Sequence, residues 1–295
     1  MKNTQNFKMK DLDAYRSHPR CFRSSKIIYP VLSRRSSGIS IGVNLNPDKS
    51  CNFKCLYCQV HRGPTSENKT SAVSLKVLEK ELRKTLELVH TGQIYQHAPF
   101  DQTPLPLRRL NDIALCGDGE PTAAAKFLPA CRICTAVKED FGLEDVKIIL
   151  ITNSSLLHLP RVKKALEILD RHQGQVWAKL DAGTENYFKF VNQTSIPFRR
   201  IMENILLAAK IRPVVIQSLF FKINGQRTPP EEIAAYAHRL AEILDKGGRI
   251  LAIQLYSIVR KPRSGRVSTL SRAEIDQIAR EIKQKVNLPL EKYYP

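Results

Sequence analysis

The sequence predicts an α/β fold, namely a partial (β/α)6 TIM-like barrel with parallel strands. Apolar segments of strand length alternate with amphipathic helical segments after residue 38, and this alternation occurs six times. Polar or glycine-rich residues follow several of these strands directly. Alternating strands and helices form a parallel sheet with the helices outside. Six units are two fewer than the eight of a complete barrel.

The six predicted strands are short apolar runs. The first alternates along its length, which is typical of a strand with one buried face, whereas the third is almost entirely apolar. The strands comprise residues 39–45, 113–116, 146–152, 176–181, 214–221 and 250–258.

The predicted helices place apolar residues three or four positions apart, as Leu78, Leu82 and nearby residues show. The last helix begins near Ser271, because Ser271 and Glu274 have the spacing of a capping box. The proline-containing stretch 91–111 is predicted to be a surface insertion. The helices comprise residues 73–90, 127–141, 161–171, 199–211, 231–244 and a segment starting at 271.

Length and composition indicate a globular protein. The 295 residues suit one large domain or two small ones, and 42% hydrophobic with 25% charged residues argues against disorder. No apolar run approaches the roughly 18 residues that span a membrane, and the N-terminus lacks the apolar core of a signal peptide. We therefore expect a cytoplasmic protein. Seven Cys in a reducing compartment favour metal or redox chemistry over disulfides.

We expect three regions: a basic N-terminal extension (residues 1–38), the barrel (39–262), and a C-terminal helix and tail (263–295). The extension contains nine basic and two acidic residues, and a second basic run spans residues 260–266. The whole chain carries 47 basic and 28 acidic residues, a net charge of +19. This balance favours phosphate-bearing partners such as RNA, and ordinary surface charge explains it equally well.

Cys51, Cys55 and Cys58 lie within eight residues, directly after the first predicted strand. Chemistry in barrels of this type sits at the carboxyl ends of the strands. Thiolates suit iron–sulfur clusters or zinc. A cubic cluster usually has four Cys ligands, so three would leave one iron for a ligand that is not protein. The alternative metal site is a Cys₃His zinc site completed by His61. The alternative function is that of a non-enzymatic RNA-binding protein that contains zinc or an Fe–S cluster.

The run Cys51-Asn-Phe-Lys-Cys55-Leu-Tyr-Cys58, followed one unit later by Gly117-Asp-Gly-Glu-Pro-Thr122, resembles the radical S-adenosylmethionine (SAM) superfamily. The resemblance covers residues 39–262. It implies a [4Fe-4S] cluster on the three Cys, with SAM chelated by the open iron. It also implies a flavodoxin- or ferredoxin-like electron donor. Cleavage of SAM would release a 5′-deoxyadenosyl radical, which abstracts hydrogen from the substrate.

The form of the glycine turn is similar to that of the branch containing the tRNA wyosine-forming synthases. This resemblance and the basic charge favour RNA as the substrate, and a protein glycyl position, a peptide or a small metabolite are the alternatives. Enzymes of that branch carry a second cluster on several N-terminal Cys. The present chain has only Cys21 before the Cys51 motif and so departs from that pattern.

The resemblance also implies cofactor-binding roles for residues after the first three strands. Tyr57 would lie near the adenine of SAM, and Gly119 with Glu120 would hold its amino group. Asn153 and Ser154 would lie near the ribose or carboxylate. The alternatives are ordinary packing for Tyr57 and an Asx-turn at Asn153.

The fourth predicted strand places Lys179 and Asp181 on the face shared by Trp177. Charged groups inside a barrel are costly unless they are paired or functional, so we expect at least one of the two to be catalytic. Their alternative is a mutual salt bridge, and Lys179 is also able to form a Schiff base with a carbonyl. Gln217 on the fifth strand and Arg260 after the sixth are expected to bind the cofactor. Arg260 is equally suited to bind a substrate carboxylate or phosphate, and its alternative is an ordinary surface position.

Three further Cys follow a different pattern. Cys131 and Cys134 share a helix face with Phe127 and Val137, which predicts packing in the core. The alternative is a second cluster completed by Cys116. Packing is favoured, because a pair in the middle of a helix lies away from the strand ends.

Overall fold

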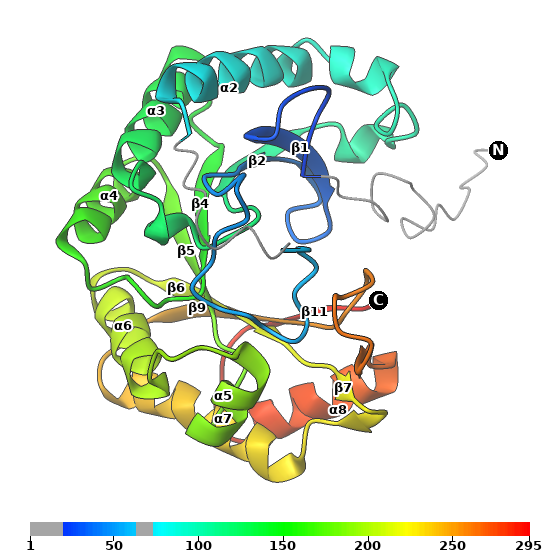
Figure 1. Ribbon diagram of the computed structural model, residues 1–295, viewed down its shortest axis with the longest axis vertical. Helices are drawn as coiled ribbons and strands as arrows, with labels where there is room; N and C mark the ends of the chain where they lie inside the picture. Colours follow the sequence, from blue (N-terminus) through cyan, green and yellow to red (C-terminus); the bar gives the residue numbers. More distant parts are fainter. Residues whose placement is uncertain (1–19, 63–72) are drawn as a thin grey trace.

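The structure is a computed structural model, and it describes residues 20–62 and 73–295. One curved eight-stranded sheet forms the centre, and helices cover its outer face (Figure 1). The strand order is β1-β2-β3-β4-β5-β6-β9-β11. Neighbouring strands from β2 onward are parallel, while β1 is antiparallel to β2. The predicted partial barrel of parallel strands is therefore confirmed. Residues 1–19 of the expected basic extension lie outside the described residues.

All six predicted strand–helix units are present with boundaries shifted by a few residues. The strands are β2 (Gly38–Val43), β3 (Leu110–Leu115), β4 (Lys147–Thr152), β5 (Gly174–Lys179), β6 (Val214–Leu219) and β9 (Ile250–Tyr256). The corresponding helices are α2 (Leu75–His90), α3 (Phe127–Asp140), α4 (Pro160–Asp170), α6 (Phe198–Ile211), α7 (Pro230–Asp245) and α8 (Arg272–Lys283). In the part of the chain that the structure describes, none of the helices has the length and apolarity needed to cross a bilayer.

The predicted capping box at the start of α8 is also confirmed. The Glu274 amide donates to the Ser271 hydroxyl at 3.3 Å, and the Ser271 amide donates to the Glu274 carboxylate at 2.7 Å. These bonds satisfy two amides at a helix end that have no partner within the helix. Stretch 91–111 forms the 3₁₀ turns η2 (Gln93–Gln96) and η3 (Leu105–Leu107), and it is attached to the core through the buried Ile94 and Phe100.

Several elements were not predicted. The strands β1 (Ile28–Ser33) and β11 (Leu290–Tyr293) form the two edges of the sheet. Pro30 interrupts the strand pattern of β1, and an edge strand is where a missing amide N–H is tolerated. The remaining elements are helix α5 (Glu185–Asn192) and a small sheet of β7 (Lys222–Ile223), β8 (Gln226–Arg227) and β10 (Val267–Ser268).

The two faces of the main sheet differ in chemistry. In β4, Ile148 and Leu150 are fully buried in the large apolar core beneath the helices. The opposite, inner face carries a small apolar cluster of Ala114, Ile149, Trp177 and Val215. The concave face is therefore free to present polar side chains above this floor.

Candidate functional site

A cavity of about 830 Å³ lies against the inner face of the sheet. Its volume is within the range of about 300–1,000 Å³ that is typical of small-molecule sites. Ser154 is the one predicted site residue that does not line it, because Ser154 is fully buried, with its carbonyl bound by the Asn204 amide at 2.8 Å. The predicted site residues that do line the cavity are Cys51, Cys55, Tyr57, Cys58, Gly119, Glu120, Asn153, Lys179, Asp181, Gln217 and Arg260.

The cysteine loop after β2 is held by the last residues of α5. The amides of Lys54 and Leu56 donate to the carbonyls of Asn192 and Val191, at 3.2 and 2.9 Å. The Asn192 side-chain amide also donates to Cys55 Sγ at 3.4 Å. A short helix that the sequence did not predict therefore fixes the loop and supplies a hydrogen-bond donor to one thiol.

A second set of bonds attaches the same loop to the end of β4. Asn52 donates to the Ser155 hydroxyl and accepts from the Asn153 amide, both at 2.8 Å. The Asn153 side-chain oxygen accepts from the Ser155 amide at 3.1 Å, so the Asx-turn considered for Asn153 is present. Asn153 thus lines the cavity and also fixes the turn.

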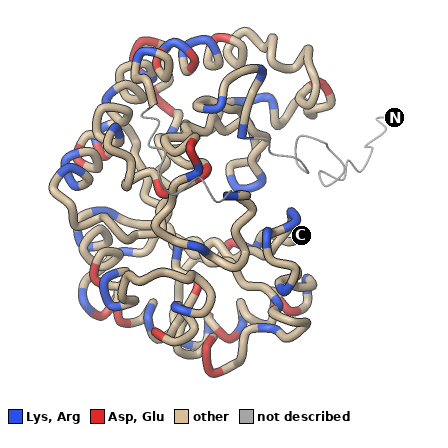
Figure 2. The backbone as a smooth tube through the Cα atoms, viewed as in Figure 1, with Lys and Arg blue, Asp and Glu red and all other residues tan. Residues whose placement is uncertain are grey.

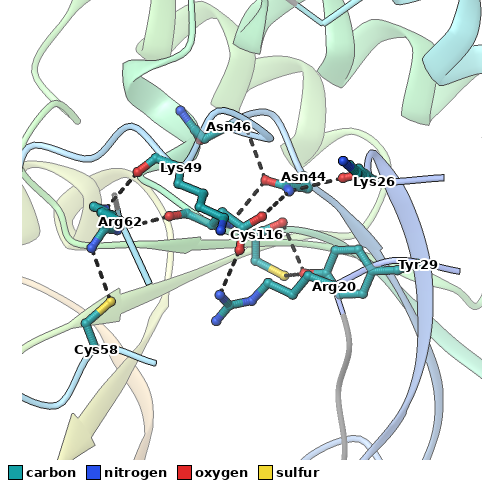
Figure 3. Close-up of polar contacts among 10 residues, drawn as sticks. Arg20, Lys26, Tyr29, Asn44, Asn46, Lys49, Cys58, Arg62 and Cys116 are labelled. Atoms are coloured by element: carbon teal, nitrogen blue, oxygen red, sulfur yellow. Dashed lines mark hydrogen bonds and ion pairs between the residues drawn. The ribbon is translucent and has the colours of Figure 1, made fainter. Parts of the chain in front are cut away.

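Arg62 joins the cysteine loop to the glycine turn after β3 (Figure 3). Its Nε donates to the Lys49 carbonyl at 2.7 Å, and its Nη2 donates to the Asp118 carbonyl at 3.0 Å. Its Nη1 lies 3.3 Å from Cys58 Sγ and donates to it. No pattern in the sequence signals this role, because the three partners meet only in the folded chain.

The glycine turn packs directly on the cysteine loop. A Cβ atom added to Gly119 would lie 1.9 Å from the Ser50 carbonyl oxygen, so only glycine fits there. Asp118 accepts hydrogen bonds from Arg20 at 2.9 Å and from the Asn44 side chain at 2.8 Å. Its side chain therefore has its own partners and leaves the close approach at Gly119 intact.

Glu120 is buried and firmly held. Its Oε1 accepts from the Thr122 amide at 3.2 Å, from the Thr122 hydroxyl at 2.5 Å and from the Thr152 hydroxyl at 2.6 Å. Its Oε2 accepts from the Asn153 amide at 2.7 Å. Burial raises the pKa of Glu120, and these hydrogen bonds oppose the shift. The less engaged Oε2 retains capacity to accept from a ligand.

Lys179 and Asp181 both reach the cavity, but they form no ion pair with each other. Asp181 Oδ1 accepts from the Leu219 amide at 2.8 Å, and Oδ2 accepts from the Tyr57 hydroxyl. Among the described residues, Lys179 Nζ has no hydrogen-bond partner. Burial disfavours its charge, but the neighbouring Tyr256 and Asp181 outweigh burial and raise the pKa of Lys179.

Gln217 and Arg260 lie at different parts of the cavity. The Gln217 side-chain amide donates to Gln254 at 2.9 Å, so it is bonded to the neighbouring strand β9. Arg260 Nε is buried without a hydrogen-bond partner. Burial, together with the nearby Arg34 and Arg35, lowers the pKa of Arg260 to about 10.

The remaining Cys are separated by the sheet. Cys131 and Cys134 are fully buried in the core beneath the outer helices, which confirms their predicted packing. Cys116 lines the cavity, with its Sγ 3.3 Å from the Tyr29 hydroxyl (Figure 3). These three thiols therefore do not gather at one place.

The three thiols of the cysteine loop are of the chemical type that binds an iron–sulfur cluster. Cys51, Cys55 and Cys58 are free thiols that face one cavity. Within residues 20–62 and 73–295, no three His, Cys, Asp or Glu side chains are already arranged as metal ligands. Burial raises the pKa of Cys55 to about 12. Metal binding would therefore have to displace protons and turn the thiols toward a common point.

Comparison with known families identifies the superfamily of this chain. The model of the radical SAM superfamily matches residues 45–228, which include the cysteine loop and the glycine turn. The chain belongs to the radical SAM superfamily. The match ends before β9, so it leaves out Arg260 and the C-terminal edge of the sheet.

Curated proteins that are similar to this chain are 25–29% identical to it over the aligned residues. A UPF0026 protein of Helicobacter pylori is 27% identical over 248 residues, covering 83% of this chain and 70% of that protein. A protein named GTPase Obg from Brachyspira hyodysenteriae is 25% identical over 186 residues, covering 62% of this chain but 23% of its own length. UPF0026 protein MJ1312 of Methanocaldococcus jannaschii is 29% identical over 164 residues, covering 56% of this chain and 43% of that protein.

The structure of TYW1 with a lysine-pyruvate adduct bound is among the solved structures that are similar to this chain, with a TM-score of 0.50 and 15% identity. The similar region covers 84% of this chain and 74% of that chain. At this identity the likeness shows a shared fold alone.

Proposed function

We propose that this protein is a radical SAM enzyme that binds a [4Fe-4S] cluster through Cys51, Cys55 and Cys58. The observation that carries the proposal is that these three thiols and the Gly119-Glu120 turn line the same cavity. When bound, the cluster and SAM would supply a 5′-deoxyadenosyl radical for hydrogen abstraction. The protein binds and orients the reacting groups and shields them from water.

Four residues of the cavity wall are proposed to bind SAM. Glu120 is held in place by the Thr122 hydroxyl at 2.5 Å and retains an acceptor site for an ammonium group. Gly119 lets the two loops approach closely, and Asn153 lines the cavity beside them. Tyr57 is kept in place by its bond to Asp181. Ser154 is left out, because it does not line the cavity.

Lys179 and Asp181 are proposed to face the substrate. Asp181 holds the Tyr57 hydroxyl and the Leu219 amide, so it organises the wall of the site. Lys179 Nζ has no hydrogen bond among the described residues and is available to a ligand. Gln217 lines the same cavity and donates a hydrogen bond to Gln254.

Imine chemistry at Lys179 is a second candidate. The observation that favours it is the same unbonded amine inside the cavity, and TYW1, which shares the fold, has been solved with a lysine-pyruvate adduct bound. Imine formation would join Lys179 Nζ to the carbonyl carbon of a 2-oxo acid and release water. Incubation with pyruvate and borohydride, followed by mass analysis of peptides, tests it. A peptide containing Lys179 that stays unmodified would reject it.

RNA is the proposed substrate class, and a flavodoxin- or ferredoxin-like protein the proposed electron donor. The net charge of +19 supports RNA, since basic surfaces attract phosphate backbones. Figure 2 shows that Lys and Arg are spread over the outer helices, and several Arg also line the cavity. All seven Cys are free thiols, which suits a reducing compartment such as the cytoplasm.

Cleavage of SAM tests the proposed function directly. The protein is reconstituted with iron and sulfide without oxygen, reduced with dithionite and given SAM. We expect 5′-deoxyadenosine from the wild type and none from Cys55→Ala. Zinc retained in place of iron, with no cleavage, would favour the alternative of a non-enzymatic binding protein.

A further inference from the structure

Four arginines line one part of the cavity: Arg20, Arg34, Arg35 and Arg260. Arg20 precedes β1, Arg34 and Arg35 follow it, and Arg260 follows β9. Strand β1 is one edge of the sheet, and β9 pairs with β11, the other edge. Positive side chains from both halves of the sheet therefore share one cavity, and Figure 2 marks basic residues on chain segments of both halves.

Two of these guanidinium groups have buried atoms without partners. The Nε atoms of Arg35 and Arg260 are buried and make no hydrogen bond. The Arg35 guanidinium lies over the Tyr256 ring, 4.3 Å from its centre, and 5.9 Å from that of Tyr293. A buried donor without an acceptor destabilises the folded protein, and native proteins keep few of them. Two such donors beside one cavity indicate a ligand that accepts hydrogen bonds.

The acidic residues of the cavity do not supply these acceptors. Asp118 takes Arg20 as its partner, at 2.9 Å, but no carboxylate within the described ranges pairs with Arg35 or Arg260. Burial and the neighbouring arginines lower the pKa of Arg260 to about 10. The other carboxylates are bound elsewhere: Asp112 by Ser40, Glu120 by Thr122 and Thr152, and Asp181 by Tyr57 and Leu219.

We propose that Arg35 and Arg260, with Arg20 and Arg34 beside them, bind a phosphate group of the substrate. This deepens the proposed function, on which it rests, by naming the substrate chemistry of the same cavity. The planar guanidinium fork matches the oxygens of phosphate, and a multiply charged anion offsets several cations at once. Bound in this way, the phosphate would link the segments that flank the edge strand β1 to the segment that follows β9.

Binding of inorganic pyrophosphate to the reconstituted protein, measured by calorimetry, tests this site without any need for turnover. We expect Arg35→Gln and Arg260→Gln each to weaken binding by about tenfold or more. Arg132→Gln, which removes the same charge from an exposed position on α3, is the matched control and should bind like the wild type. Unchanged affinity in the two cavity variants, or equal weakening in Arg132→Gln, would overturn the proposal.

Further arms separate the sources of the anion. If a short RNA loses affinity in the same two variants, the phosphate belongs to an RNA backbone; if only pyrophosphate does, it belongs to a small molecule. If malonate binds as tightly as pyrophosphate, the site does not select phosphate over carboxylate, and the proposal is rejected. Thermal unfolding checks that the variants fold, and Arg260→Lys should restore part of the affinity. Because pyrophosphate binding needs no SAM cleavage, failure of the proposed function is detected separately.

A separate observation concerns the cysteine loop. The Arg62 guanidinium is fixed by two backbone carbonyls, of Lys49 at 2.7 Å and Asp118 at 3.0 Å (Figure 3). Its third contact is a donated bond to Cys58 Sγ at 3.3 Å. A charged donor to a ligating sulfur stabilises the reduced, more negative state of a cluster and so raises its potential.

We infer that Arg62 is a positioning residue that raises the reduction potential of the cluster proposed at Cys58. A redox titration followed by electron paramagnetic resonance should give a lower midpoint for Arg62→Gln than for the wild type. Arg263→Gln is the control. The backbone amide of Arg263 donates to the Cys58 carbonyl at 2.9 Å, but its side chain is exposed. An unchanged midpoint in Arg62→Gln, or an equal shift in Arg263→Gln, would contradict the inference. Iron content of the wild type tests the proposed cluster independently.

Discussion

The cysteine loop and helix α3 place the same side chain in two different settings. Burial raises the pKa of Cys55 in the loop and of Cys134 in the helix to about 12 in both cases. Cys55, however, accepts from Asn192 at 3.4 Å and lies near the Lys179 charge, and both lower its pKa. For Cys134, burial is the sole cause of the shift.

This difference shows that burial alone does not distinguish a proposed metal ligand from a packing residue. The polar neighbours do, because a thiolate on a metal needs donors and positive charge around it. The loop thiols are surrounded by Asn192, Lys179 and Arg62, whereas those of α3 contact the apolar core.

The largest expected effect is on iron content. Cys55→Ala should lose nearly all cluster iron after reconstitution, because two thiols are too few for a cubic cluster. Cys134→Ala should retain the iron of the wild type. Iron and sulfide per chain are measured by chemical analysis, and equal loss in both variants would erase the distinction between the two regions.

Gly119→Ala should have the next largest effect. Its Cβ would lie 1.9 Å from the Ser50 carbonyl, so the turn and the loop would have to move apart. Overpacking of this kind costs about 1–3 kcal/mol of unfolding free energy. Urea unfolding measures it, and Gly265→Ala, where no atom lies within 4 Å, is the matched control. Equal stability of both variants would show that the loops are not tightly packed.

Removal of a core thiol should have a smaller effect that is confined to stability. Cys134→Ala leaves a small cavity in a fully buried site, which should lower the free energy of unfolding by about 1 kcal/mol. The effect should appear in urea unfolding with no change in iron content. A change in iron content would place this helix in the metal site after all.

The smallest expected effect is a change with pH in the cluster-free protein. The ordinary pKa of 9.0 rises to about 12 for Cys134 in the folded state, so the unfolded chain loses this proton first. The stability contributed by the thiol is therefore complete below about pH 9 and declines as the pH rises toward 12. Urea unfolding at several alkaline pH values should show a shallower decline in Cys134→Ala. Parallel curves for the two proteins would contradict the raised pKa.

The alternating core of the fold was readable from sequence because local periodicity determines it. The six strands and their helices follow from apolar spacing, and the loop thiols from their position after a strand. Strand β11 was not readable, since two of its four residues are exposed and its pairing with β9 is distant in sequence. Arg62, Arg35 and Asn192 were missed for a similar reason. Their partners come from other parts of the chain, and no local pattern identifies such contacts.

The contact between Gly119 and Ser50 has a consequence for protein engineering. A designer who transplants residues 51–58 into another scaffold would move three thiols but leave behind the surface that shapes their loop. The transferable unit is larger, since it includes the turn at residues 117–120 and the end of α5 at Asn192. A graft that preserves every contact described for the loop also needs residues 153–155 after β4 and Arg62 with its partner Lys49.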